Sequence, residues 1–259
     1  MIFDTHAHYD DEAFDIDREE LLGSMRENNV QYIVNVGASM QGVLDTVSLM
    51  EKYDLVYGAL GIHPDHAGDL TEKEMEQLHA LLQKEKAVAV GEIGLDYYWD
   101  KASHEVQKKW FAEQLHLASE LELPINVHSR EASQDSFDLI CAEHAKRPGF
   151  RGGIIHCYSG SPEMAREYVK RGYHIGIGGV VTFKNARVLK EVAAQIPLEA
   201  IVVETDCPYL APTPYRGKRN SSLFIPYIIE EIARIKEVPP QEVEMATYRN
   251  ACRVYNIQE

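Results

Sequence analysis

Short runs of apolar and β-branched residues recur along the whole chain, and each run ends in a polar residue or a glycine. Parallel strands that are buried on both faces have this appearance, because their continuous apolar run stops where the chain passes into a loop. The runs predict eight strands, at residues 1–6, 31–37, 55–63, 87–94, 123–129, 151–157, 173–179 and 200–206.

Helical patterns fill the segments between these runs. Thr71 and Glu74 have the spacing of a capping box, and the apolar residues behind them recur with the period of one helix face. In residues 161–172, Ser161 is a good N-cap and Gly172 is a common stop signal. Residues 238–243 predict a turn between two helices. Strands and helices therefore alternate from one end to the other.

This alternation favours a (β/α)8 barrel, the TIM barrel. Eight strands in a chain of 259 residues agree with the ~250 residues typical of that fold. An open doubly wound sheet is the alternative, and the absence of a Gly-x-Gly-x-x-Gly pattern after the first run weakens it. No linker or change of composition divides the chain, so we expect a single domain over residues 1–259.

Charge and cysteine content narrow the classes of partner. The chain has 41 Asp and Glu against 26 Lys and Arg, a net charge of -15, so any polyanion needs a local binding site. The four cysteines lie far apart, which argues against a disulfide framework or a zinc knuckle. No basic leader or membrane-length apolar stretch is found. We expect an unprocessed cytoplasmic protein without membrane association or a stable protein partner.

Candidate metal ligands stand at the carboxyl ends of the predicted strands. His6 and His8 lie two positions apart, so an extended strand sends both imidazoles to the same side. Four further candidates close four other runs: Glu92, His128, His156 and Asp206. In a TIM barrel these strand ends converge on one mouth. Metal-binding residue types at strand after strand therefore predict a metal site.

The ligands suffice for two divalent ions. A ligand set of imidazoles and carboxylates fits Zn, Mn, Fe, Ni or Co better than Ca. The supply of metals in the cell can favour Mg or Mn. The identity of the bound metal therefore stays open among Zn, Mn, Mg, Ni and Co. Two ions about 3.5–4 Å apart can hold a bridging hydroxide. We expect one ion to lie among His6, His8 and Asp206, and the other between His128 and His156. Glu92 is expected to bridge the two ions.

Five segments carry a family resemblance: FDTHAHYD, GEIGLDYYWD, LPINVHSR, GIIHCYSG and ETDCPYLAPTPYRGKRN. In this order and over essentially the whole chain, they resemble the motifs of the TatD family of metal-dependent hydrolases. The resemblance implies a barrel related to the amidohydrolase superfamily, with the same six metal ligands and deoxyribonuclease activity from the 3′ end. The sequence departs from the family pattern at Tyr9, where many members have Leu, and at residues 220–222, where Asn-Ser-Ser replaces Asn-Glu-Pro.

Other residues near the predicted ligands receive catalytic or supporting roles. Asp206 is expected to take a proton from the nucleophilic water as well as bind metal. Glu204 and Asp4 each precede a ligand by two positions, so we expect them to support the ligands from one layer deeper. His63 ends the third run and is expected to protonate a leaving oxygen or bind a phosphate, with a structural role as the alternative. Cys157 is expected to point toward the helices.

Cations near the strand ends are candidate phosphate contacts. Arg130 follows the fifth run, and alternation points it at the mouth. Arg216, Lys218 and Arg219 follow the eighth run, in a loop that this fold uses for phosphate binding. The aromatic residues 97–99 are expected to stack an unpaired base or to pack under a loop.

The leading functional hypothesis is phosphodiester hydrolysis by a metal-bound hydroxide, as a 3′–5′ exonuclease on single-stranded or frayed DNA. An acidic surface repels a long duplex, whereas metals and a few cations hold one end. The alternative is a metal-dependent ester or amide hydrolase, such as one that removes a D-amino acid from tRNA. A non-catalytic metal-binding scaffold would need a break in the ligand set, and the sequence contains none.

Overall fold

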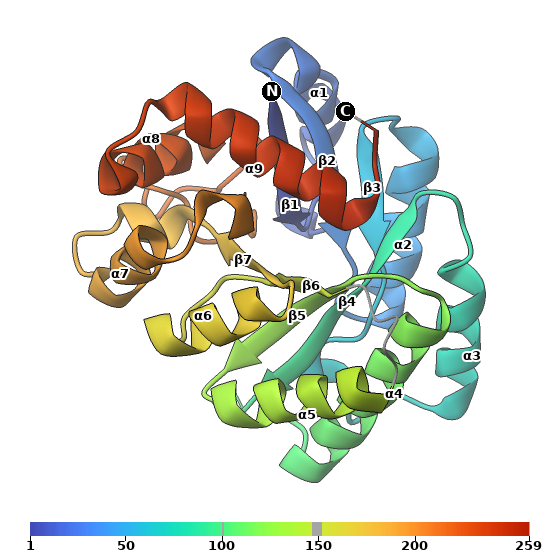
Figure 1. Cartoon of the computed structure of the whole chain (residues 1–259). Coiled ribbons are helices and arrows are strands. Elements are labelled where there is room, and N and C mark those ends of the chain that lie inside the picture. Colours follow the sequence, from blue (N-terminus) through green and yellow to red (C-terminus); the bar gives the residue numbers. More distant parts are fainter. Residues whose placement is uncertain (100, 147–151, 259) are drawn as a thin grey trace.

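The computed structural model describes residues 1–99, 101–146 and 152–258. Its strands are parallel, and each pairs with the next along the chain (Figure 1). They are β1 (Ile2–Ala7), β2 (Val30–Val36), β3 (Val56–Ala59), β4 (Ala87–Asp96), β5 (Ile125–Arg130), β6 (Gly153–Ile155), β7 (His174–Ile177) and β8 (Ile201–Val203).

The sheet closes into a barrel between β1 and the residues that follow β8. The backbone N–H of Asp206 donates to the carbonyl of His6 at 2.9 Å, and the N–H of His8 donates to the carbonyl of Cys207 at 2.9 Å. This seam between the first and last strands places the candidate ligands His6, His8 and Asp206 next to one another. The predicted (β/α)8 barrel is confirmed.

Helices alternate with the strands and surround the barrel (Figure 1). They are α1 (Arg18–Gly23), α2 (Met40–Lys52), α3 (Glu72–Leu81), α4 (His104–Glu120), α5 (Ser133–Lys146), α6 (Pro162–Lys170), α7 (Arg187–Gln195), α8 (Ile225–Lys236) and α9 (Pro240–Tyr255). The capping box of Thr71 and Glu74 begins α3, and Ser161 caps α6, as predicted. In the described part of the chain, no helix combines the length and apolar character needed to cross a membrane.

Several strands end at positions other than those predicted from the apolar runs. β4 continues to Asp96, whereas β3 ends at Ala59 and β8 ends at Val203. Residues 60–62 and 204–205 are nevertheless buried, because the loops at the barrel mouth pack against each other. Apolar content reports burial and not strand pairing, so the runs overextended several strands, including β6 and β7, which end at Ile155 and Ile177. The predicted sixth strand begins at Arg151, which lies outside the described residues.

Gly94 allows β4 and β5 to approach each other beside the candidate site. A Cβ atom at this position would lie 1.9 Å from the carbonyl oxygen of His128, and its φ of +147° is rarely adopted by other residues. The close approach fixes the spacing of β4 and β5 at the level of His128.

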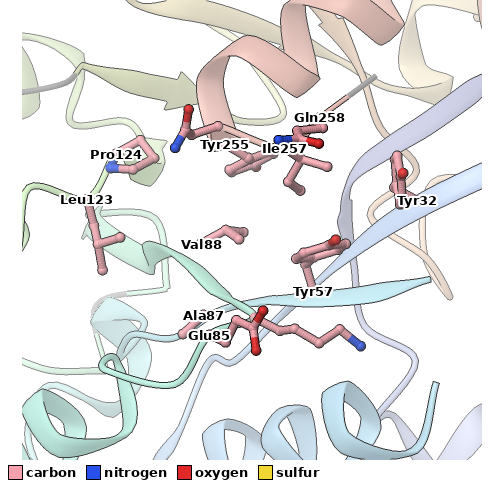
Figure 2. Close-up of a pocket in the computed structure, with 12 residues that line it drawn as sticks. Tyr32, Tyr57, Glu85, Ala87, Val88, Leu123, Pro124, Tyr255, Ile257 and Gln258 are labelled. Carbon is pink, nitrogen blue, oxygen red and sulfur yellow. The ribbon is translucent and has the colours of Figure 1, made fainter. Parts of the chain in front are cut away.

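Helix α9 covers the opposite, amino-terminal end of the barrel. Tyr255 from α9 and Phe3 from β1 belong to one cluster of buried apolar side chains, with their ring centroids 5.7 Å apart. Figure 2 shows the cavity of about 460 Å³ at this end, where Tyr255 lies opposite Tyr32 and Tyr57. The candidate ligands occupy the other end of the barrel, so support from α9 can reach them only through the barrel interior.

Candidate metal centre

His6 and His8 present the same ring atom to the barrel mouth. Their Nε2 atoms are 3.1 Å apart. The Nδ1 of His6 lies 3.1 Å from Oδ1 of Asn126, and the Nδ1 of His8 lies 2.9 Å from the carbonyl of Val36. Carbonyl oxygens only accept hydrogen bonds, so each Nδ1 must carry a proton. Nε2 is therefore the atom of each ring that can bind a metal.

Glu92 lies between two pairs of histidines. Its Oε2 is 3.6 Å from Nε2 of His6 and 3.9 Å from Nε2 of His8. Its Oε1 is 2.8 Å from Nε2 of His156 and 3.1 Å from Nδ1 of His128. Each carboxylate oxygen of Glu92 thus faces one pair of histidines, which is the arrangement that a bridging carboxylate requires.

His128 faces the centre through its other ring nitrogen, because Asp96 holds Nε2. The distance from Nε2 of His128 to Oδ2 of Asp96 is 2.9 Å. The other oxygen of Asp96 accepts the backbone N–H groups of Tyr98 and Trp99 at 2.9 Å each. The sequence-based site did not include Asp96. Alternation along β4 places it on the same side as Glu92, and that signal could have found it.

His156, which follows β6, is more deeply buried than His128 on β5. Its ring stacks on that of His6 with centroids 3.7 Å apart, and Oε1 of Glu204 lies 3.7 Å from its Nδ1. The same Glu204 oxygen accepts the N–H of Cys157 at 2.5 Å. Within the described residues, the buried Nε2 of His156 makes no hydrogen bond of good geometry, although Oε1 of Glu92 lies 2.8 Å away. A buried imidazole beside the carboxylates of Glu92 and Glu204 has the donor chemistry of a divalent metal ligand.

Asp206 completes the centre from the loop after β8. Its Oδ1 lies 3.4 Å from Nε2 of His8 and 3.8 Å from Nε2 of His6. The residue adopts a left-handed backbone with φ of +55° and keeps 18% of its side chain exposed. Among the described residues, three groups have ligand atoms close enough to share one ion: His6, His156 and Asp206; His6, His8 and Glu92; and His63, Glu92 and His128. Imidazole nitrogens and carboxylate oxygens together suit a divalent transition metal.

Asp4 connects β1 to the segments after β8 by accepting hydrogen bonds from hydroxyl and backbone N–H groups. It accepts the hydroxyls of Thr205 and Ser222 at 2.6 Å each and the N–H of His6 at 3.3 Å. Burial raises the pKa of Asp4 to about 7 despite these bonds. The N–H of Ser222 also donates to the Tyr9 hydroxyl at 2.9 Å. The two departures from the family pattern noted above therefore lie in one buried hydrogen-bond network beside the ligands.

Without a bound metal, the surrounding charges favour a proton on Nε2 of His8, the atom that would bind a cation. Burial lowers the pKa of His6, and the charge of His156 lowers it further. Burial also opposes protonation of His8, but Asp206 and Glu92 outweigh it and raise the pKa of His8 to about 9. The proton on Nε2 of His8 then points at the bare Nε2 of His6.

Metal binding is therefore expected to release protons. With a pKa of about 9, His8 is protonated near neutral pH and must lose the proton from Nε2 to become a ligand. The apparent affinity for Zn²⁺ or Mn²⁺ should therefore rise as the pH approaches 9. Titration calorimetry in buffers of different ionisation enthalpy measures the released protons. A binding heat that is independent of the buffer would contradict this charge distribution.

His63 reaches the centre as a hydrogen-bond donor. It precedes the short 3-10 helix η3 (Pro64–His66), and its Nδ1 accepts the N–H of Asp65 at 3.1 Å. Nε2, 3.8 Å from Oε1 of Glu92, must therefore carry the proton of the neutral ring. Burial, with the nearby charge of His128, lowers the pKa of His63 to about 4. This tautomer excludes metal binding through Nε2, although the atom is close enough.

A cleft of about 880 Å³ opens above the ligands. Its rim includes Trp99 and Tyr209, which are 57% and 56% exposed. Of the residues that the structure describes, Arg130 and Lys101 are the Arg and Lys side chains that line it. Arg130 places its guanidinium 4.0 Å from the ring centroid of Tyr98, and Lys101 pairs with Asp65 at 2.8 Å. Lys101 and Tyr209 were not predicted from the sequence, because both lie on loops without strand alternation.

The basic cluster after β8 lies away from the cleft. Arg219 pairs with both oxygens of Asp17 and donates to the carbonyl of Ala13 at 2.7 Å. Arg216 lies 4.4 Å from the ring centroid of Phe183. Neither these arginines nor the exposed Lys218 is among the described residues that line the cleft. The geometry ties the loop to neighbouring segments, and a phosphate contact by these residues stays a prediction.

Cys157 lines the cleft, contrary to the expectation that it would point toward the helices. The prediction was wrong because β6 ends at Ile155, so strand alternation no longer applies. Cys157 has a left-handed backbone with φ of +42°, which turns its side chain back toward the mouth.

Comparison with known proteins gives a consistent picture. The sequence pattern of a protein family described as TatD related DNase matches residues 3–256. The uncharacterized metal-dependent hydrolase YabD of Bacillus subtilis is 42% identical over 257 residues, covering 99% of this chain and 100% of the relative. The uncharacterized metal-dependent hydrolase TatD of Mycobacterium tuberculosis is 34% identical, covering 98% of this chain and 97% of the relative.

Solved structures agree with these sequence comparisons. The crystal structure of YJJV, a TatD homolog from Escherichia coli, superposes with a TM-score of 0.92 at 30% identity, covering 99% of this chain and 98% of the other. A TatD family hydrolase from Entamoeba histolytica has a TM-score of 0.88 at 24% identity, covering 99% and 98%. The second likeness concerns the fold alone.

Proposed function

The chain belongs to the TatD family of metal-dependent hydrolases, and on this premise we propose that it hydrolyses a phosphodiester at the 3′ end of single-stranded or frayed DNA. The observation that carries the proposal is the cleft itself. Metal ligands lie at its base, and at its rim Arg130 stacks on the exposed rings of Tyr98 and Trp99. Anion binding and base stacking are thereby available beside the metal site.

The shape and charge of the cleft favour an end over the interior of a duplex. Exposed aromatic rings bind unpaired bases, since base–aromatic stacking needs an open π-face. Asp10, Asp11 and Asp65 line the same cleft and would repel the two phosphate strands of a duplex. A single strand can pass along Arg130 with its terminal phosphodiester over the ligands.

The chemistry divides among named residues. Divalent ions bound by the His and carboxylate ligands would supply Lewis-acid stabilisation of the charge that develops on the phosphate. Asp206 combines a lowered pKa with an exposed edge, so its carboxylate is ionised and able to accept a proton from water. His63 offers Nε2–H to a phosphate oxygen. A neutral ring with a pKa of about 4 is a hydrogen-bond donor and not a proton source, which favours phosphate binding over protonation of the leaving oxygen.

Hydrolysis of a D-aminoacyl ester on tRNA is the second candidate. The same ligands could polarise an ester carbonyl. The acidic residues of the cleft favour this alternative, because Asp10 and Asp65 could bind the ammonium group of an aminoacyl ester. The aromatic rim serves either substrate, since the acceptor end of tRNA is also single-stranded.

The two functions are separated by offering three substrates in parallel, each with Mg²⁺, Mn²⁺ or Zn²⁺. They are 3′-labelled single-stranded DNA, the same sequence as a blunt duplex, and D-aminoacyl-tRNA. We expect nucleotides to be released from the single strand, more slowly from the duplex, and no deacylation. Trp99→Ala should slow cleavage of the single strand by about 5- to 150-fold, since stacking contributes about 1–3 kcal/mol per base, without lowering metal content. Cleavage of the ester alone would replace the first candidate with the second.

A further inference from the structure

A buried hydrogen-bonded group lies behind His6, on the side away from the cleft. It consists of Asn126 from β5, the backbone carbonyl of Thr5 from β1, and the hydroxyl of Tyr255 from α9. The side chains of Asn126 and Tyr255 are buried, and so is Thr5. Neither Asn126 nor Tyr255 reaches the cleft, so neither can touch a substrate.

Donor and acceptor roles in this group can be assigned without ambiguity. The carbonyl of Thr5 only accepts, and it receives the Tyr255 hydroxyl at 3.0 Å and Nδ2 of Asn126 at 3.3 Å. The same Nδ2 also donates to the oxygen of Tyr255 at 3.3 Å. The amide of Asn126 is therefore oriented with Nδ2 toward Thr5, and its Oδ1 must face Nδ1 of His6, 3.1 Å away.

We propose that Asn126, held in orientation by Tyr255, is a positioning residue that fixes the tautomer and ring plane of His6 for metal binding. An amide oxygen at Nδ1 requires the proton there and leaves Nε2 of His6 bare toward Glu92 and Asp206. Without that acceptor the proton can move to Nε2, and the ring can rotate. Outer hydrogen bonds of this kind contribute about 10- to 100-fold to metal affinity.

His6 differs from two other candidate ligands in the partner of its outer nitrogen. His128 and His156 face Asp96 and Glu204 on their outer nitrogens, whereas His6 faces an amide. The ring of His6 stacks directly on His156, so a hydrogen bond that fixes the ring plane of His6 also keeps this contact.

The group also connects the metal centre to the far end of the barrel. Tyr255 lies at the end of α9, and its ring lines the cavity at the amino-terminal end (Figure 2). The last turn of α9 therefore supports the ligand on β1 through two side chains. This inference concerns metal binding and holds whichever substrate the cleft accepts.

The test compares metal affinity in variants of the full-length chain. Asn126→Leu removes the acceptor at similar volume and should weaken Zn²⁺ binding by about 10- to 100-fold in competition with a chromophoric chelator. Asn126→Asp keeps an acceptor for Nδ1 of His6 but loses the Nδ2 donor to Thr5, so it should recover part of the loss. Asn250→Leu is the matched control. Asn250 is equally buried, bonds only carbonyls of residues 198 and 201 among the described residues, and should lose stability without a change in affinity.

A second measurement distinguishes positioning from general damage to the fold. In metal-free protein labelled with ¹⁵N-histidine, the nitrogen shifts of His6 should report protonated Nδ1, and Asn126→Leu should move the population toward protonated Nε2. Tyr255→Phe keeps the ring and should weaken Zn²⁺ binding by several-fold, which provides a test if Asn126→Leu does not fold. Affinity within twofold of the unmodified protein in both variants, or an unchanged His6 tautomer in Asn126→Leu, would overturn the proposal.

Discussion

Replacing Asp206 with Asn is expected to reduce turnover by about 10³-fold or more while leaving the barrel folded. The substitution keeps the shape of the side chain and removes the carboxylate that accepts a proton. Proton transfer of this kind typically contributes about 10²–10⁴-fold to the rate. The substitution also weakens one metal ligand. Asp206 combines a lowered pKa with 18% exposure at the base of the cleft, so it can meet a water molecule there. Turnover on the preferred substrate and thermal unfolding measure the two effects.

Asp54→Asn is the matched control for this variant, because Asp54 is an exposed carboxylate that follows α2, away from the cleft. It should match the unmodified protein in turnover and melting temperature. Metal analysis of Asp206→Asn should still find ions bound by the remaining ligands. Full activity in Asp206→Asn would remove Asp206 from the mechanism.

Glu92→Gln is expected to abolish tight metal binding as well as activity. The burial of Glu92 by itself would raise its pKa, but His156 and His63 outweigh this effect and hold the pKa well below its usual range. The ionised carboxylate also raises the pKa of His8, His128 and His156. Its loss leaves these rings without the anion that both pairs share, and each candidate metal-binding group that contains Glu92 loses a ligand.

The same variant should destabilise the metal-free protein. Removing one partner of a buried ionic group costs about 3–5 kcal/mol of unfolding free energy, because the remaining charge is left uncompensated. Since the pKa of Glu92 is depressed in the folded state, this contribution is present above the ordinary carboxylate pKa of 4.5 and is lost as pH falls through the lower folded value. Urea unfolding near neutral pH measures it, and metal analysis measures the ions. Glu76→Gln, an exposed change on α3, serves as the control.

The sequence predicted which candidate side chains lie together where backbone geometry is simple. His6 and His8 share a side of the chain because residues two apart in an extended segment point the same way, and the structure places their Nε2 atoms 3.1 Å apart. Alternation along β4 would also have placed Asp96 beside Glu92, had the strand been read beyond residue 94. The apolar run ended at that point, and the prediction ended with it.

Loop positions could not be read from the pattern in the same way. Cys157 turned toward the cleft because a left-handed backbone follows β6, and Arg219 pairs with Asp17 from a distant segment. The tautomer of His63 depends on a local turn, in which Asp65 donates to Nδ1. Each outcome depends on backbone angles or on partners far away in sequence, and neither leaves a periodic signal.

The sequence by itself predicted the barrel and the candidate ligands. Eight apolar runs that alternate with amphipathic helices favour a closed parallel barrel, and such a barrel brings strand ends together. The tertiary structure alone decided which ring nitrogen each histidine presents. That choice depends on partners from other strands: Asn126 for His6, the carbonyl of Val36 for His8 and Asp96 for His128. Asn126 is in turn bonded to Tyr255 of the last helix. A hydrogen bond across the barrel depends on distances of a few tenths of an ångström, and only packing of the whole chain fixes those distances.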